Sequence, residues 1–199
     1  MKRIVKQLLY AVSIALVFPL AASERLARKL LARDVWFVTH GEALSLLPGK
    51  IGYFIRNGYY RLTLQQCRMG CQLSFGTYFM HSEAELGNAV YMGTRCLVGI
   101  ATVGDDVLLA DHVQVLSGAR QHIPSGLGNG SHEQGARFIR VRIGKGTWIG
   151  AGAIVMADVG EHCIVGAGSV VTKPIPDFSV AAGNPARVIR SNTPAASRG

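Results

Sequence analysis

Aliphatic residues recur every six positions over much of the second half of the chain. The series Leu86, Met92, Val98 resumes after a break at Ile143 and Ile149, and each member is followed by glycine. This spacing fits neither an α-helix, with its period of about 3.6, nor a half-buried strand, with its period of about 2. A six-residue repeat is typical of a parallel β-helix, in which each unit forms one flat side of a triangular coil. We therefore expect stacked coils that share one aliphatic core.

Twelve units keep this phase, with two short steps. Val98 to Val103 spans five residues and Val155 to Val159 spans four, which we interpret as shortened corners. Cys163 occupies an interior small position of the repeat, and we expect a buried, inert thiol there, as at Cys96. The other small or β-branched residues at this position are Val90, Thr102, Val107, Val113, Thr147, Ala153 and Ser169.

The repeat is interrupted between Val115 and Ile143. The intervening sequence SGARQHIPSGLGNGSHEQGARFIRVR is rich in Gly, Ser and His and supplies no aliphatic residues at a spacing of six. It predicts a protruding loop over residues 117–142. Long loops on a rigid scaffold commonly carry function.

Residues 1–70 have a different pattern. Residues 8–22 form a 15-residue apolar stretch behind a basic N-terminus, and residues 24–33 resemble a short amphipathic helix. A second apolar and basic stretch covers residues 44–64. Residues 8–22 are short for a span of the roughly 30 Å hydrocarbon core. Four interpretations stay open: a helix in the membrane interface, a single span, a cleaved signal sequence, or an ordinary cap on the coil.

Charge favours the membrane interface. The chain has 199 residues with 21 Lys and Arg and 12 Asp and Glu, and residues 1–75 hold 11 of the basic and 3 of the acidic residues. Their neighbours are Leu, Val, Ile, Phe and Tyr, which suit anionic lipid better than nucleic acid. The four cysteines form no C-x-x-C pair, which argues against a zinc finger and a disulfide-rich scaffold.

Residues 143–190 resemble the hexapeptide-repeat O-acetyltransferases, the group of the galactoside, maltose, capsule and colanic-acid acetyltransferases. The segments GAGSVVTK and GNPARVIR carry the resemblance, and SLLPGKIGYFIRNGYYRLTL is similar to the polysaccharide-biosynthesis branch. The resemblance implies a left-handed β-helix domain over residues 71–190, a helical N-terminal region over residues 1–70 and a flexible tail over residues 191–199. It also implies a homotrimer with acetyl-CoA as donor and an active site between subunits.

Transfer of an acetyl group to a sugar hydroxyl needs a base, and an imidazole suits that role near neutral pH. In the family this histidine lies where the repeat gives way to the loop, which here indicates His122 as general base. His132 and His81 are the alternatives. His112 lies in the middle of a repeat unit, and we expect it at the surface.

The resemblance also assigns residues to coenzyme A. Small residues admit the pantetheine arm, and two arginines spaced by three would meet the phosphates; a solubilising basic tail is the alternative for these arginines. Trp148 is expected to point outward, onto a neighbouring subunit or the acceptor sugar. The residues assigned to the coenzyme are Ala151, Ala167, Thr172, Lys173, Arg187 and Arg190.

Three classes of function follow. The first is an acetyl-CoA-dependent O-acetyltransferase acting on a saccharide, possibly lipid-linked, in exopolysaccharide or capsule biosynthesis. The second is a metal-dependent hydratase of the carbonic-anhydrase kind, which would recruit His112, His122 and His132 to a zinc ion. The third is a non-catalytic β-helix scaffold. Because acetyl-CoA is cytosolic, the first class predicts a protein at the cytoplasmic face of the inner membrane.

Overall fold

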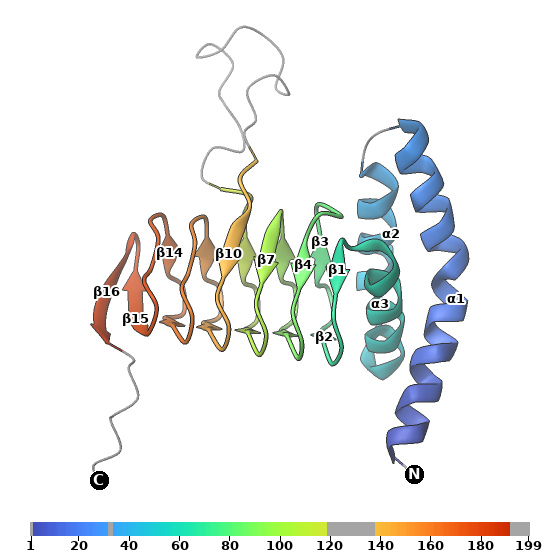
Figure 1. Ribbon diagram of the computed structural model, residues 1–199, viewed down its shortest axis with the longest axis horizontal. Helices are drawn as coiled ribbons and strands as arrows, with labels where there is room; N and C mark the ends of the chain where they lie inside the picture. Colours follow the sequence, from blue (N-terminus) through green and yellow to red (C-terminus); the bar gives the residue numbers. More distant parts are fainter. Residues whose placement is uncertain (1, 32–33, 119–137, 192–199) are drawn as a thin grey trace, which may run out of the picture.

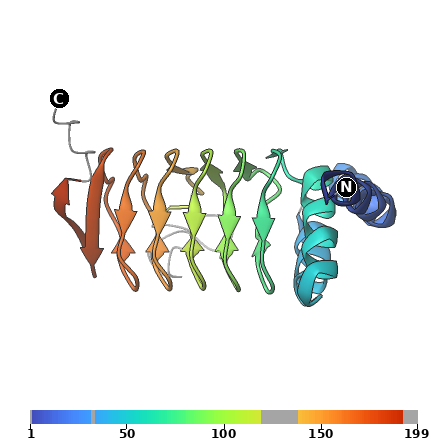
Figure 2. The same cartoon turned by 90° about the horizontal axis from the view of Figure 1, so that it is seen from below.

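The computed structural model describes residues 2–31, 34–118 and 138–191. A long triangular coil of short strands runs through the molecule, and three helices pack across its N-terminal end (Figure 1). The helices are α1 (Lys2–Leu31), α2 (Val35–Ser45) and α3 (Gly49–Thr63). In a view from below, the strands of successive coils lie side by side along the axis (Figure 2). This is the parallel β-helix that the hexapeptide repeat predicts, with the left hand that the family resemblance implies.

Three sheets form the sides of the coil, and all their pairings are parallel except the last, β15 with β16. Sheet A contains β1 (Gln66–Cys67), β4 (Glu85–Leu86), β7 (Ala101–Val103) and β10 (Val141–Ile143). Sheet B contains β2 (Gln72–Leu73), β5 (Tyr91–Met92), β8 (Leu108–Leu109), β11 (Trp148–Ile149), β13 (Ile164–Val165), β15 (Ser179–Gly183) and β16 (Ala186–Ser191). Sheet C contains β3 (Tyr78–Phe79), β6 (Leu97–Val98), β9 (Gln114–Val115), β12 (Ile154–Val155) and β14 (Val170–Val171). We call the corners between the sheets the AB, BC and CA edges.

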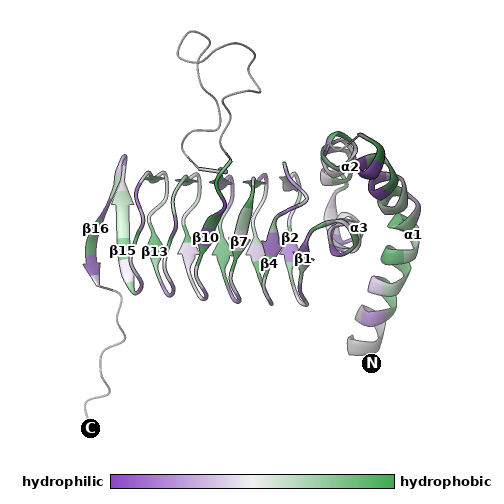
Figure 3. Cartoon of the chain, turned by 45° about the horizontal axis from the view of Figure 1, so that its top comes forward, coloured by the Kyte–Doolittle hydropathy of each residue, from purple (hydrophilic) through white to green (hydrophobic). Residues whose placement is uncertain are grey.

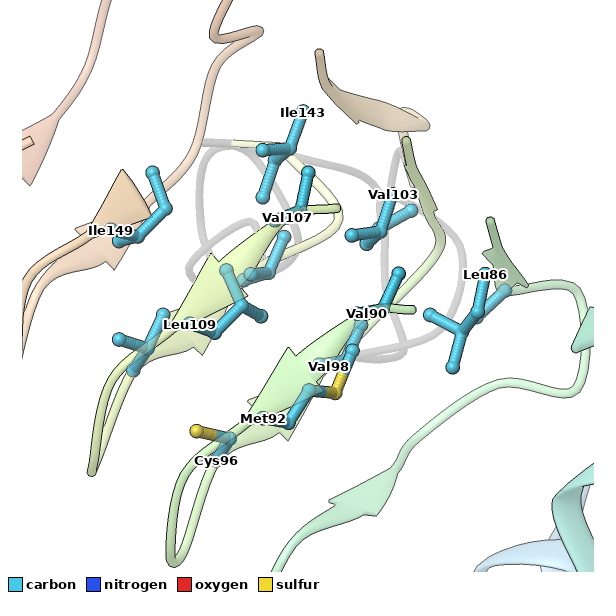
Figure 4. Close-up of a cluster of buried hydrophobic side chains, with 14 of the residues drawn as sticks. Leu86, Val90, Met92, Cys96, Val98, Val103, Val107, Leu109, Ile143 and Ile149 are labelled. Atoms are coloured by element: carbon cyan, nitrogen blue, oxygen red, sulfur yellow. The ribbon is translucent and has the colours of Figure 1, made fainter. Parts of the chain in front are cut away.

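The repeating aliphatic residues fill the coil. Leu86, Met92 and Leu109 are fully buried and stack with their counterparts from neighbouring coils (Figure 4). The repeat starts earlier than we expected, because Leu73 and Phe79 take the same interior positions although no glycine follows them. The first strand lies at Gln66–Cys67, ahead of the boundary expected at residue 71.

Both short steps of the repeat fall on the CA edge, where the chain turns from sheet C to sheet A. One of the expected interior residues is different. Thr102 lies beside Glu85 on the outer side of sheet A, and Ala101 is buried instead. The five-residue step shifts the strand by one position, and such a shift exchanges the two faces of a strand.

Aspartates fasten each coil to the preceding one. At the AB edge the Asn88 amide donates to Asp105 Oδ1 at 2.7 Å, and at the BC edge the Thr94 amide donates to Asp111 Oδ1 at 2.6 Å. These hydrogen bonds hold the pKa of both carboxyls below the usual value. The coils are so close that a Cβ added to Gly87 would lie 2.7 Å from the amide nitrogen of Asp105, so only glycine fits there.

The helical cap is joined to the coil by a buried arginine. Arg56 of α3 is 1% exposed, and its guanidinium donates to the carbonyls of Leu44, Ser45 and Leu47 at the end of α2. It also donates to the carbonyl of Leu73 in the first coil at 3.1 Å. Burial lowers the pKa of the Arg56 side chain.

The first helix is continuous. α1 runs through Pro19 without a break, whereas the sequence had suggested a separate short helix over residues 24–33. Its inner face packs along α3 and buries Val17 and Ala21. In the described part of the chain, α1 is the one helix long and apolar enough to cross a membrane, over Gln7–Leu30. Coloured by hydropathy, α1 of the cap carries long apolar stretches (Figure 3).

Candidate active site at the edges of the coil

The loop leaves the coil at a rigid base on the CA edge. Ser117 is fully buried, and its hydroxyl accepts a hydrogen bond from the Ile100 amide at 2.7 Å. The chain re-enters with Ile139, whose amide donates to the Ser117 carbonyl at 2.9 Å. Gly118 has a φ of +85°, a conformation that favours glycine. His122 and His132 lie outside the described residues.

A histidine oriented by a carboxylate lies beside this base. His81 Nδ1 is 3.6 Å from Asp34 Oδ2, and the ring of His81 lies 4.9 Å from that of Phe138, at the return of the loop. Asp34 is itself held, because the amide and hydroxyl of Ser82 donate to its two carboxylate oxygens at 3.2 and 2.8 Å. With Nδ1 toward the carboxylate, Nε2 is the ring nitrogen left for other partners.

Burial and hydrogen bonding act against each other on Asp34. Burial raises its pKa, but the hydrogen bonds from His81 and Ser82 outweigh burial and hold the pKa below its usual value. Asp34 is therefore ionised at neutral pH and keeps the imidazole oriented. The sequence analysis named His81 only as an alternative base and missed Asp34, because a partner 47 positions away in the chain leaves no periodic signal.

A polar row crosses the outer side of sheet A next to the loop. Arg140, two residues after Phe138, donates to Thr102 Oγ1 at 3.2 Å and to Gln65 Oε1 at 3.3 Å. It also forms an ion pair with Glu85 at 3.7 Å. These four side chains offer hydrogen-bond donors and acceptors on one face, and the sequence analysis assigned none of them to the site.

Two of the residues assigned to coenzyme A lie together on the BC edge. Ala151 and Ala167 occupy equivalent turns of successive coils, joined by the Gly168 amide donating to the Ala151 carbonyl at 2.8 Å. No atom lies within 4 Å of a Cβ built on Gly152 or Gly168, so this strip is open to solvent. His112 lies one coil earlier on the same edge and is exposed, as predicted.

The two C-terminal arginines share one face. Residues three apart on a strand normally face opposite sides. However, Arg190 pairs with Val180 while Val188 pairs with Ala181, so Ile189 is an extra, bulged residue. The bulge returns Arg187 and Arg190 to the same, outer side of sheet B.

Trp148 belongs to that outer side as well. It is 50% exposed and pairs in register with Leu108 and Ile164 on the neighbouring strands. Tyr91 continues this row on β5, which makes an apolar stripe along the outside of sheet B. Its outward direction confirms the expectation from the repeat.

Thr172 and Lys173 lie elsewhere, on the CA edge after β14, where both are exposed. Within one protomer the residues assigned to coenzyme A are thus divided between the BC edge, the outer side of sheet B and the CA edge. In the described ranges no group of three or more His, Cys, Asp or Glu is placed to hold a metal ion. Two of the three histidines of the zinc hypothesis lie outside those ranges.

Comparison with known proteins agrees with this architecture. Residues 140–173 match the bacterial transferase hexapeptide (six repeats) family. A maltose O-acetyltransferase from Clostridium difficile 630 is 26% identical, with a TM-score of 0.65, over 81% of this chain and 88% of its own. No curated protein sequence matches the chain significantly.

Two more distant structures share the fold. A hexapeptide-repeat acetyltransferase from Vibrio cholerae is 18% identical, with a TM-score of 0.66, over 79% of this chain and 91% of its own. A galactoside acetyltransferase solved with coenzyme A is 22% identical, with a TM-score of 0.56, over 78% of this chain and 80% of its own. The hexapeptide-repeat β-helix predicted from the sequence is thereby confirmed, and its solved neighbours are acetyltransferases.

Proposed function

We propose that this protein transfers an acetyl group from acetyl-CoA to a hydroxyl of a saccharide. The observation that carries the proposal is the end of sheet B, where two coaligned arginines adjoin a strip of small, open residues. Arg187 and Arg190 suit the phosphates of the nucleotide end, and the strip at Ala151 and Ala167 suits the slender pantetheine arm. The likeness to the maltose O-acetyltransferase supports the class of acceptor, and the neighbour solved with coenzyme A supports the donor.

The reaction requires one proton to move twice. The acceptor oxygen attacks the thioester carbonyl while a histidine takes the hydroxyl proton, and the tetrahedral intermediate then expels the coenzyme A thiolate. The histidinium returns the proton to the sulfur, so the products are the acetyl ester and free coenzyme A. We assign the base to His122. The Asp34-oriented His81 stands beside the same loop as the alternative base.

We further propose that the site is completed in a homotrimer. Three copies related by a threefold axis can bring the BC edge of one protomer to the CA edge of the next. Thr172 and Lys173 would then join the coenzyme bound at Ala151 and Ala167. The apolar row at Tyr91, Leu108, Trp148 and Ile164 supports this assembly, because a neighbouring subunit would cover it.

Replacement of the base tests the reaction. We expect His122→Ala to lower acetyl transfer about 100-fold or more, the usual contribution of a positioned base, without changing coenzyme A binding. His162→Ala is the matched control, since His162 is an exposed histidine on the AB edge, away from both edges assigned to the site. A loss in His81→Ala or His132→Ala with normal turnover in His122→Ala would move the base to that residue.

We propose a role in exopolysaccharide or capsule biosynthesis at the cytoplasmic face of the inner membrane. The basic N-terminal region and the apolar outer face of α1 support this location, and cytosolic acetyl-CoA requires it. Mass spectrometry of surface glycans from cells with and without the gene would identify the acetylated sugar. Unchanged glycan acetylation would contradict this role.

A further inference from the structure

Two cavities adjoin where α1 passes the end of α3. The first, which we call the apolar groove, has a volume of about 270 Å³, and Phe18, Ala21, Leu26 and Leu62 supply much of its wall. The second, the polar pocket, has a volume of about 260 Å³ and is lined among others by Thr63, Gln65 and Ser82. Arg25 and Leu62 line both cavities, so the two lie next to each other.

Basic side chains lie at the boundary between these cavities, and the far wall of the polar pocket carries the exposed carboxylate of Glu83. Arg25 donates from its guanidinium to the Leu62 carbonyl, which fixes it at the junction. Lys29 lies one helical turn further along the groove and is exposed. Arg28 lines the polar pocket, but it is paired with the buried Glu24 at 3.2 Å. Arg25 and Lys29 therefore present their charge to whatever occupies the boundary.

The polar pocket leads toward the candidate active site. Gln65 lies in its wall and accepts the hydrogen bond from Arg140 at the return of the loop. Ser82 also lies in its wall, next to His81 and hydrogen-bonded to Asp34. A ligand that fills both cavities would thus have an apolar part on α1, an anionic part at Arg25 and a polar part beside the loop.

We propose that the two cavities bind an amphiphilic acceptor, namely a saccharide joined through phosphate to a hydrocarbon chain. The hydrocarbon occupies the apolar groove, and the phosphate lies between Arg25 and Lys29, where a guanidinium and an ammonium complement it. The sugar extends over Gln65 and Ser82 toward the acetyl donor. This inference rests on the proposed function, of which it names the acceptor class.

Vesicle flotation of the full-length protein tests the site. Phosphatidylcholine vesicles carrying polyprenyl phosphate are compared with vesicles of equal surface charge carrying phosphatidylserine, and with phosphatidylcholine alone. We expect the tightest binding to polyprenyl phosphate. Lys29→Ala should weaken it about fivefold, the effect of one cation at an anionic surface. Lys145→Ala removes an equally exposed charge from the coil and should change nothing.

A second pair of variants separates the groove from the general surface of α1. Phe18 and Leu16 are similarly exposed, at 59% and 64%, but only Phe18 lines the apolar groove. Phe18→Ser should reduce the preference for polyprenyl phosphate, whereas Leu16→Ser should retain it. Equal effects of the two variants would overturn the groove as a binding site.

Two further results would count against the inference. Equal binding to phosphatidylserine and polyprenyl phosphate would indicate an unspecific response to membrane charge. Competition by a soluble hexose phosphate as strong as that by polyprenyl phosphate would indicate a free phosphate ligand. Titration of the protein with coenzyme A distinguishes a failure of the lipid site from a failure of the proposed acetyltransferase function. Lost coenzyme binding with retained lipid preference would contradict the acetyltransferase and leave the lipid site intact.

Discussion

The sequence around a residue predicts the direction and partners of its side chain for some residues and not for others. The outward direction of Trp148 and the exposure of His112 follow from the repeat, because each unit repeats the same backbone path. Thr102 was placed wrongly, because the short step shifts the strand by one residue. The Asp34 and Ser82 contact joins residues 48 apart, and no local pattern predicts such a pair.

Arg56 tests how the cap is held on the coil. Replacement by Met keeps the length of the side chain but leaves the carbonyls of Leu44, Leu47 and Leu73 without their buried donor. An unsatisfied buried polar group costs about 1–3 kcal/mol, so we expect Arg56→Met to lose at least about 2 kcal/mol of unfolding free energy. Thermal or urea unfolding followed by circular dichroism measures this loss.

The control for Arg56 lies on the same helix. Lys50 of α3 is exposed, and Lys50→Met removes the same charge at a position that no buried carbonyl depends on. Surface substitutions usually change stability by less than about 0.5 kcal/mol. Equal unfolding midpoints for the two variants would show that the Arg56 hydrogen bonds contribute nothing net.

Among the elements, the coil was predictable and the helices were less so. Each strand of the coil follows the same local pattern, in which an inward aliphatic residue precedes a small residue at the turn. The pattern persists across the two shortened corners. α1 follows no such rule, because packing on α3 stabilises it through Pro19. The bulge at Ile189 was invisible in the sequence, although it decides which way Arg187 and Arg190 face.

The β15–β16 hairpin gives a kinetic prediction. Replacing Arg187 and Arg190 together by Ala should raise the apparent KM for acetyl-CoA far more than it lowers kcat, because the phosphates are remote from the reacting carbonyl. Steady-state assays with varied acetyl-CoA measure the two constants. Arg95→Ala is the control, since Arg95 is a cation of the BC edge near the other end of the coil. An unchanged KM would assign the two arginines to a merely solubilising tail.

At the scale of the whole molecule, α1 has two apolar faces. The inner face packs on α3, and the Tyr10 hydroxyl contacts that of Tyr53 at 2.8 Å. The outer face is directed away from α3, opposite Val17 on the helix. Its large apolar residues are 55–75% exposed: Leu8, Val12, Leu16 and Leu30. We propose that a membrane covers this second apolar face.

We predict that α1 lies flat in the membrane interface instead of spanning the bilayer. Spanning would separate α1 from α3 and expose the buried Val17 and Ala21, whereas a flat helix buries its outer face and keeps these contacts. Val12→Glu combined with Leu16→Glu should move the protein from the membrane to the soluble fraction while leaving its unfolding temperature unchanged. Protease added to intact cells should not cut the chain, which should still begin at Met1. External cleavage would indicate a span, and a mature chain that begins near Ala22 would indicate a signal sequence.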